Sequence, residues 1–231
     1  MRQSRRMLST LRRHAALLVP PCCALCGASG QWLDEPWGLD LCAYCEAACP
    51  RWQVEALPFD AAFCLFRYEH PVDRMITRLK FHGELVFARV LGTLLARAHR
   101  ATDRTLPEYI VPMPLHCTRY RERGFCQTTE IARHVSRRLR MRVRPDLLHR
   151  VRATAAQSGL TAAQRSANLR GAFAAPSLRG LPRHIALLDD VLTTGHTALA
   201  AVAALRGAGI ERIELWCCAR AERHDVANYG V

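Results

Sequence analysis

The sequence predicts an α/β fold with a parallel sheet, preceded by a small cysteine-rich unit. Near the carboxyl end, an apolar run at 184–188, a helical pattern at 197–206 and an alternating segment at 211–217 follow one another, which is typical of parallel α/β folds. The 231 residues, 50% of them hydrophobic, suffice for one principal core but not for two full-sized domains. Six of the 11 cysteines lie before residue 55, which marks this stretch as a separate unit.

The cysteine-rich unit has the spacing of two metal-binding knuckles. Cys23 and Cys26 form one C-x2-C pair, and after fifteen intervening residues Cys42 and Cys45 form another. Each pair places two thiolates on one turn, and two turns together supply the tetrahedral four-sulfur shell that suits Zn²⁺. Four protein ligands leave no open coordination position, so we expect a structural zinc.

Two domains are expected: a zinc-binding, double zinc ribbon-like unit at 1–57 and an α/β domain at 58–231. Cys22 and Cys49 could replace one of the four ligands, and the sequence does not choose between them. Reduced, buried cysteines without a metal are the alternative for the whole cluster.

The α/β domain is expected to begin with a strand and two helices. Four alternating residues predict a half-buried strand: Ala62, Cys64, Phe66 and Tyr68. Helical spacing then predicts helices over 72–79 and 84–100. Residues 109–111 form a short apolar strand that runs into the loop Pro112-Met113-Pro114, and another helix is expected over 127–139.

Residues 150–180 are rich in Ala, Arg and Ser and show little periodicity, which predicts a long mobile excursion. Such loops are uncommon unless they are functional. The strand at 184–188, the helix at 197–206 and the strand at 211–217 complete the order of elements, with Gly207 and Gly209 ending the helix.

The formal net charge of +13 favours polyanionic partners, such as nucleic acid or phosphorylated small molecules. Lys80 is the single lysine among 33 basic residues, so the arginine content could equally reflect a GC-rich genome. No apolar run approaches the roughly 20 residues of a transmembrane helix, and the apolar residues 15–19 are too few for a signal peptide. We therefore expect a cytoplasmic protein without membrane insertion.

The most specific segment couples two acids to a hydroxyl-rich turn. Asp189 and Asp190 follow the apolar strand, and Thr193-Thr194-Gly195 then opens a helix whose first turn holds Thr197. Backbone N–H groups at a strand's carboxyl end and at a helix N-terminus converge and favour a phosphate, and Gly195 lets the backbone approach it closely. The acids would repel that phosphate, so they are expected to bind sugar hydroxyls. A 5-phosphorylated ribose meets both requirements.

This segment resembles the phosphoribosyl pyrophosphate (PRPP) loop of type I phosphoribosyltransferases, and the whole chain is similar to the ComF (competence protein F) family, related to the GntX proteins. The resemblance also rests on the four-cysteine unit and on these segments and residues: 79–83, 111–116, 121–127, Gln157, Arg165, Asn168, Gly171 and Phe173. It implies the Rossmann-like parallel sheet of the type I phosphoribosyltransferase fold. Cys126 stands where Asn is usual and His196 where a small Ala is usual; His196 could add a cation near the phosphate or point to solvent.

The resemblance implies roles for the site residues. Asp189 and Asp190 would hold the ribose hydroxyls and stabilise a cation-like transition state. Lys80 and Arg123 are candidates for the pyrophosphate, whose Mg²⁺ would neutralise charge; the alternative for Lys80 is a solvated helix end. The residues expected to bind PRPP are Asp189, Asp190, Val191, Leu192, Thr193, Thr194, Gly195, His196, Thr197, Pro114 and Leu115, and those expected to take part in catalysis are Asp189, Asp190, Lys80 and Arg123.

A basic tract at 119–152 holds 11 arginines against three acids. We expect Arg133, Arg137 and Arg140 to share one helical face and to track the phosphate backbone of single-stranded DNA. Aromatic residues for base stacking are sparse in the tract, so a purely solvated face is the alternative.

Three functions stay open at this point. The first is a competence protein that binds PRPP and single-stranded DNA and supports DNA uptake in natural transformation, with DNA-import or recombination proteins as partners. The second is a phosphoribosyltransferase that joins a nucleobase or amine to PRPP, and the third is a regulator that only senses PRPP. No separate segment with base-reading groups is evident, which favours the first.

Overall fold

The computed structural model describes residues 22–28, 39–52, 57, 59–102, 104–153, 171–176 and 180–221. The chain separates into two compact units, Met1–Cys49 and Pro50–Val231. The domain boundary expected at residue 57 stays a prediction. Within the described ranges, no helix is long and apolar enough to cross a membrane.

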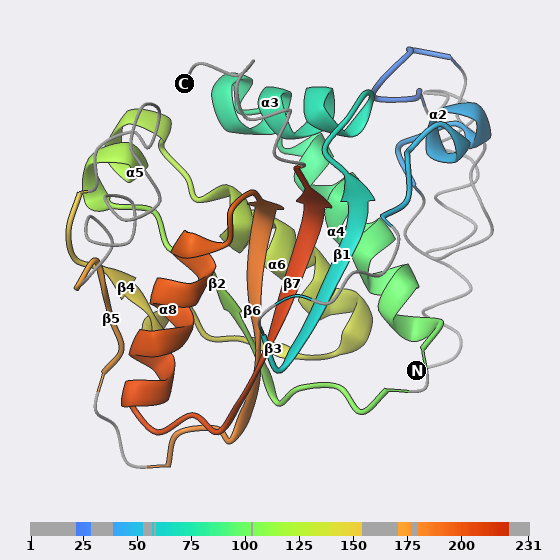
Figure 1. Ribbon diagram of the computed structural model, residues 1–231. Helices are drawn as coiled ribbons and strands as arrows, with labels where there is room; N and C mark the ends of the chain where they lie inside the picture. Colours follow the sequence, from blue (N-terminus) through green and yellow to red (C-terminus); the bar gives the residue numbers. More distant parts are fainter. Residues whose placement is uncertain are drawn as a thin grey trace, which may run out of the picture. The chain divides into compact units, whose positions relative to one another are not determined.

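A five-stranded parallel sheet forms the centre of the larger unit (Figure 1). In spatial order its strands are β1 (Ala61–Arg67), β7 (Arg212–Arg220), β6 (His184–Leu192), β2 (Tyr109–Pro112) and β3 (Arg142–Val143). Every neighbouring pair of strands is parallel. The α/β class with a parallel sheet that the sequence predicts is confirmed.

Helices cover both faces of this sheet. They are α3 (Val72–His82), α4 (Val86–Arg100), α6 (Gln127–Leu139) and α8 (His196–Gly207). Figure 1 shows α8 on one face and α4 and α6 on the other. Each amphipathic helix buries an apolar stripe against the sheet or its neighbour; α3, for example, buries Val72, Met75, Ile76 and Leu79. The four predicted helices are confirmed, and α6 has the predicted bounds.

The remaining elements of the described residues are short. They are α2 (Ala43–Ala47), α5 (Cys117–Arg123), the 3₁₀ helix η1 (Pro145–Leu147), β4 (His149–Arg150) and β5 (Phe173–Ala174). β4 and β5 pair antiparallel. Of the excursion predicted at 150–180, residues 154–170 and 177–179 lie outside the described residues, and so do Gln157, Arg165 and Asn168.

The alternation of side chains along β6 determines which residues reach each face. Ile185 and Leu187 belong to the buried cluster that includes Ala201 and Leu205 of α8. Ala186 and Leu188 are also fully buried, and the period of two places them on the opposite face. The two acids that follow therefore point to opposite faces, Asp189 toward the α8 side and Asp190 toward the α3 side.

Two elements differ from the sequence prediction. β6 continues to Leu192 instead of ending at residue 188, because its ladder with β7 runs through both acids to the Leu192 and Arg220 pair. Helix α5 is absent from the prediction because its sequence has no apolar periodicity and it buries no residue. Gly124, with a left-handed φ of 79°, ends this helix.

The prediction that Arg133, Arg137 and Arg140 share one helical face is wrong for Arg140. Helix α6 ends at Leu139, and Arg140 takes a left-handed φ of 58° as its C-cap. The chain turns away from the helix axis there, so Arg140 does not continue the row of Arg133 and Arg137.

Candidate functional site

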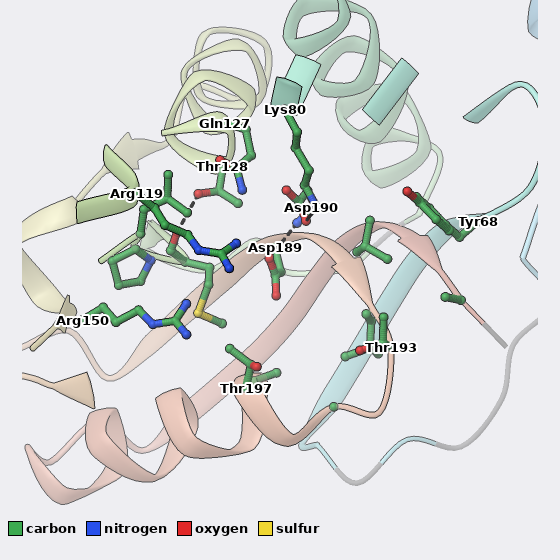
Figure 2. Close-up of a pocket in the computed structure, with 18 of the residues that line it drawn as sticks. Tyr68, Lys80, Arg119, Gln127, Thr128, Arg150, Asp189, Asp190, Thr193 and Thr197 are labelled. Carbon is green, nitrogen blue, oxygen red and sulfur yellow. Dashed lines mark hydrogen bonds and ion pairs between the residues drawn. The ribbon is translucent and has the colours of Figure 1, made fainter. Parts of the chain in front are cut away.

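A cavity of about 370 Å³ lies at the carboxyl ends of β6 and β2, the edge at which open parallel sheets bind ligands. Residues from the end of β6, the loop after β2, the turn before α8 and helices α3, α5 and α6 line it (Figure 2). The predicted site residues among them are Lys80, Pro114, Leu115, Arg123, Asp189, Asp190, Val191, Leu192, Thr193, Gly195 and Thr197. Thr194 and His196 do not line this cavity, although both lie in the described part of the chain.

The two acids occupy different environments in the cavity. Lys80 Nζ lies 2.9 Å from Asp190 Oδ1, and Figure 2 shows the lysine reaching from α3 to this carboxylate. Asp190 Oδ2 is buried and has no hydrogen-bond partner among the described residues. Asp189 Oδ1 accepts a hydrogen bond of 2.9 Å from the Asp190 backbone N–H. Asp190 is thus held by an ion pair, whereas Asp189 faces the α8 side of the cavity.

Burial and charge repulsion change the acidity of these groups. Burial, and then the neighbouring Asp190 carboxylate, raises the pKa of Asp189 from 3.8 to about 7. Burial alone would lower the pKa of Lys80, but the Asp190 and Asp189 carboxylates outweigh it and leave that pKa above its ordinary value. Lys80 therefore stays charged, and Asp189 is the carboxyl that titrates close to neutral pH.

The turn between β6 and α8 has the geometry of an anion-binding turn. Gly195 caps α8 with a left-handed φ of 81°, a conformation that strongly favours glycine. No side chain among the described residues caps this helix, so the N–H groups of its first turn are left to bind a ligand. Thr193 and Thr197 add hydroxyl groups at the cavity wall.

Two residues hold this turn from outside the cavity. His196 Nδ1 lies 2.7 Å from Thr194 Oγ1, which ties the imidazole to its neighbour beside the cavity. Arg220, at the end of β7, donates hydrogen bonds to the carbonyl oxygens of Leu192 and Thr193. The carbonyl oxygens of Leu192 and Thr193 therefore point toward Arg220. Arg220 holds the start of the turn, and the contact between His196 and Thr194 holds its end.

Three arginines face Asp189 across the cavity: Arg119 and Arg123 of α5 and Arg150 of β4. A fourth cation, Lys80 of α3, lies beside the acids and is paired with Asp190. Figure 2 shows the guanidinium groups of Arg119 and Arg150 pointing toward the space between Asp189 and Thr197. Burial lowers the pKa of Arg123, and burial together with Arg119 lowers the pKa of Arg150. An anion bound here would offset the cost of crowding these charges.

Sequence reasoning missed several lining residues, namely Tyr68, Arg119, Gln127, Thr128 and Arg150. Arg119 and Arg150 lie within the basic tract at 119–152, where the charge pattern alone suggested contact with DNA. Thr128 donates a hydrogen bond of 2.6 Å to the Met113 carbonyl oxygen and so anchors the loop after β2. Gln127 belongs to the segment 121–127 that carries the family resemblance and Tyr68 to a predicted strand, but the sequence does not place either of them at the cavity, because the fold brings these residues together from separate elements.

Comparison with known proteins places this chain in a family. No protein-family model matches the chain. Competence protein F of Haemophilus influenzae is 35% identical over 207 residues, which span 87% of this chain and 85% of that protein. The DNA utilization protein YhgH of Escherichia coli K12 is 31% identical across 88% of this chain and 99% of that protein. The chain belongs to the competence protein F family. The resemblance inferred from the motifs is confirmed.

Comparison with solved structures aligns this chain with two adenine phosphoribosyltransferases at low TM-scores. That of Leishmania tarentolae has a TM-score of 0.41 and 12% identity, over 72% of this chain and 94% of the enzyme. That of Leishmania donovani has a TM-score of 0.38 and 13% identity, over 71% of this chain and 86% of the enzyme.

The smaller unit of this competence protein F relative holds the four predicted cysteines in one cluster. The Sγ atoms of Cys23, Cys26, Cys42 and Cys45 all lie within 4.8 Å of one another, close enough to hold a metal ion. The Cys45 backbone N–H donates a hydrogen bond of 3.4 Å to Cys42 Sγ, a contact that stabilises a thiolate. Cys49 instead donates its S–H to the Cys45 carbonyl oxygen at 3.3 Å. Neither Cys22 nor Cys49 belongs to the cluster among the described residues.

The arginines that were predicted to contact DNA lie away from the cavity. Arg133, Arg137 and Arg140 are exposed, and none of them lines the cavity of the acids. Arg133 forms an ion pair with Glu130 one turn earlier on α6. Such an exposed ion pair is weak, and the contact of these arginines with DNA stays a prediction.

Proposed function

We propose that this member of the competence protein F family binds PRPP in the cavity between the acids and the arginines and supports DNA uptake in natural transformation. The observation that carries the proposal is one cavity with three matching parts: an anion-binding turn at Thr193–Thr197, a carboxyl at Asp189 and a wall of arginines. PRPP carries a phosphate, sugar hydroxyls and a pyrophosphate, and each part suits one of these groups. The names of the relatives, competence protein F and DNA utilization protein, support the role in DNA handling.

Each group of PRPP has a preferred place in this proposal. The 5-phosphate binds the turn and the N-terminus of α8. The ribose hydroxyls donate to the carboxylate of Asp189, with Asp190 held by Lys80 beside it. The pyrophosphate lies against Arg119, Arg123 and Arg150, because guanidinium groups match phosphate oxygens in pairs.

Mg²⁺ fits the same cavity. It prefers oxygen ligands, and a carboxylate such as Asp189 together with the pyrophosphate oxygens supplies them. The ion would neutralise the charge of the pyrophosphate when both are bound. Lys80 would then serve mainly to hold Asp190, rather than to bind the pyrophosphate as the resemblance implies.

Calorimetric titration with PRPP and Mg²⁺ tests this function. We expect saturable 1:1 binding to the native chain and none to Asp189→Asn, because an amide cannot accept from both hydroxyls as a carboxylate does. Asp146→Asn, which changes an exposed aspartate of η1 outside the cavity, is the matched control and should bind as the native chain does. Equal binding by native protein and Asp189→Asn would remove the proposed site.

Pyrophosphate release separates a binding protein from an enzyme. The protein is incubated with PRPP, Mg²⁺ and a panel of nucleobases and amines, and released pyrophosphate is measured. Release that depends on one acceptor would establish phosphoribosyltransferase activity. Binding without release from any acceptor would support a competence protein that uses PRPP as a ligand.

We further propose that the four-cysteine cluster binds a structural zinc. The four sulfur atoms and the Cys45 N–H bond to Cys42 Sγ support a tetrahedral thiolate site without an open position. Metal analysis of the native protein should find one zinc per chain, and Cys42→Ser should lose it. Cys49→Ser is the control, because Cys49 lies outside the cluster and a serine retains a hydrogen-bond donor for the Cys45 carbonyl. A native protein without zinc would reject the site.

A further inference from the structure

A second, larger cavity adjoins the proposed PRPP site. Its volume is about 750 Å³, and it shares five lining residues with the first cavity: Lys80, Phe81, Arg119, Arg123 and Arg150. Its other lining residues come from the end of α3, from α5, from the loops beside these helices and from the segment after β4: His82, Gly83, His116, Thr118, Glu122, Phe125 and Ala153. The two cavities therefore have a common wall, and that wall is cationic.

An exposed aromatic ring stands at this wall. Phe81 is 53% exposed, an uncommon state for a phenylalanine, and it lies at the C-terminal end of α3. The Arg123 guanidinium lies 5.7 Å from the centre of its ring. Phe125 adds a second aromatic side chain to the same cavity. A flat aromatic ligand can stack on the open face of Phe81 while its charge meets the arginine.

The charges of the cavity favour an anion with such a ring. Three arginines, Arg119, Arg123 and Arg150, are opposed by one fixed anion, Glu122, in this lining, and the fourth cation, Lys80, is paired with Asp190. Arg119 and Arg123 project from one helix, α5, with spacing of four residues, so both reach the same side of the cavity. A ligand that has a phosphate and an unpaired flat base meets both requirements, and that combination is a nucleotide.

The site also distinguishes between forms of nucleic acid. Bases inside a duplex have both faces stacked, and at a duplex end the free face belongs to a whole base pair, so the ring of Phe81 matches an unpaired base best. The cavity meets the proposed PRPP site at their common wall, where the arginines already serve the pyrophosphate in the proposed function. A DNA strand that continued beyond the second cavity would have to cross the PRPP site. A DNA strand that ends in the second cavity needs room there for its last nucleotide alone.

We infer that the second cavity binds the terminal nucleotide of single-stranded DNA, with the base on Phe81 and the terminal phosphate on the arginines that also face PRPP. The inference rests on the proposed function and extends it: the strand end and PRPP compete for Arg119, Arg123 and Arg150. This places the DNA contact at α3 and α5, instead of at α6 where the sequence alone suggested it.

Fluorescence anisotropy with labelled oligothymidylates tests the inference. Phe81→Ala should weaken binding by roughly 5- to 150-fold, the range of one stacked base. Glu122→Gln should strengthen binding, because it removes the one fixed negative charge of the cavity. Tyr120→Ala, an aromatic 50% exposed on the same helix but outside both cavity linings, is the matched control and should change binding less than two-fold.

Two further measurements test the preference for a phosphorylated strand end and the competition between DNA and PRPP. An oligonucleotide with a terminal phosphate, at either end, should bind more tightly than one with hydroxyl ends or than circular single-stranded DNA. Saturating PRPP with Mg²⁺ should remove the advantage of the phosphate, because both ligands use the same arginines. The double variant Arg133→Ala, Arg137→Ala should bind like the native chain, since α6 lies outside this cavity.

The inference fails if Phe81→Ala binds as tightly as the native chain, if circular DNA binds as well as a phosphorylated end, or if the α6 double variant loses binding. PRPP binding to the native chain is measured separately by calorimetry. Intact PRPP binding without any binding of single strands would overturn this inference and leave the proposed function standing, whereas loss of both would reject both.

Discussion

Replacing Asp189 with asparagine should make the protein more stable at alkaline pH while it abolishes PRPP binding. Asp189 is partly buried near the end of β6, beside a second carboxylate, and it accepts a hydrogen bond from the Asp190 N–H. An asparagine retains an oxygen at this position that accepts the same bond. The substitution therefore removes the charge with little change in shape.

The size of the effect follows from the acidity of the group. Burial raises the pKa of Asp189 from 3.8 to about 7, a difference of about 3 units. Each unit corresponds to about 1.4 kcal/mol, so ionised Asp189 costs the folded state up to about 4 kcal/mol. Because the folded pKa is raised, the native state holds a proton that the unfolded chain has released. Stability should fall as the pH rises from about 4 to about 7 and stay low above this range.

Urea unfolding at pH 4 and pH 8 measures this difference. Asp189→Asn should exceed the native chain in free energy of unfolding at pH 8 and match it at pH 4. Asp146→Asn is the control of opposite sign, because hydrogen bonding from Arg144 lowers the pKa of Asp146. Because Asp146 is exposed, the Asp146→Asn variant should have a slightly lower free energy of unfolding than the native chain at pH 8 and the same free energy at low pH. A variant at position 189 that is no more stable at pH 8, or equally stabilised at both pH values, would refute the reasoning.

Two further predictions concern the packing around the site. Lys80→Met should destabilise the fold by about 3 to 5 kcal/mol in urea unfolding, because it leaves the buried Asp190 carboxylate without its partner at 2.9 Å. Adding Asp190→Asn to that variant should recover most of the loss; no recovery would mean that the lysine acts through packing instead of charge. Gly92→Ala should cost about 1 to 3 kcal/mol, because the new methyl would lie 2.7 Å from His134 Cβ and 2.8 Å from the Ile131 carbonyl oxygen, where α4 meets α6. Gly207→Ala, which meets nothing within 4 Å at the end of α8, should be neutral or slightly stabilising, and equal losses in the two glycine variants would contradict the close packing of α4 on α6.

The sequence predicts the sheet and its main helices because their apolar residues repeat with the period of the element. Helix α6 is the clearest case, since its buried side chains Ile131, Ala132, Val135 and Leu139 follow one stripe. Helix α5 has no such stripe: it is built of polar and charged residues, and none of them is buried. Periodicity cannot predict a helix that packs no face against the core.

Only one part of the candidate site could be predicted from the sequence. Asp189, Asp190 and the threonine turn lie within one short segment, so their spacing along the chain reports their spacing in the fold. Arg119 and Arg150 reach the cavity from α5 and β4, which are separated from that segment by more than thirty residues. Their charge is evident in the sequence, but the place where it acts depends on long-range packing.

The length of β6 also differs between the sequence prediction and the structure. The apolar run ends at Leu188, and polar residues after it suggest a loop. Backbone hydrogen bonding to β7 is independent of side-chain polarity, and it carries the strand through both acids to Leu192. This extension is what directs Asp189 and Asp190 to opposite faces of the sheet and gives them different partners.

A crystal structure of the protein with PRPP and Mg²⁺ tests the proposed site most directly. We expect the 5-phosphate on the turn from Thr193 to Thr197, the ribose hydroxyls at Asp189 and the pyrophosphate against Arg119, Arg123 and Arg150. An empty cavity at saturating PRPP, or a ligand bound in the reverse direction with its pyrophosphate on the threonine turn, would contradict the proposed site.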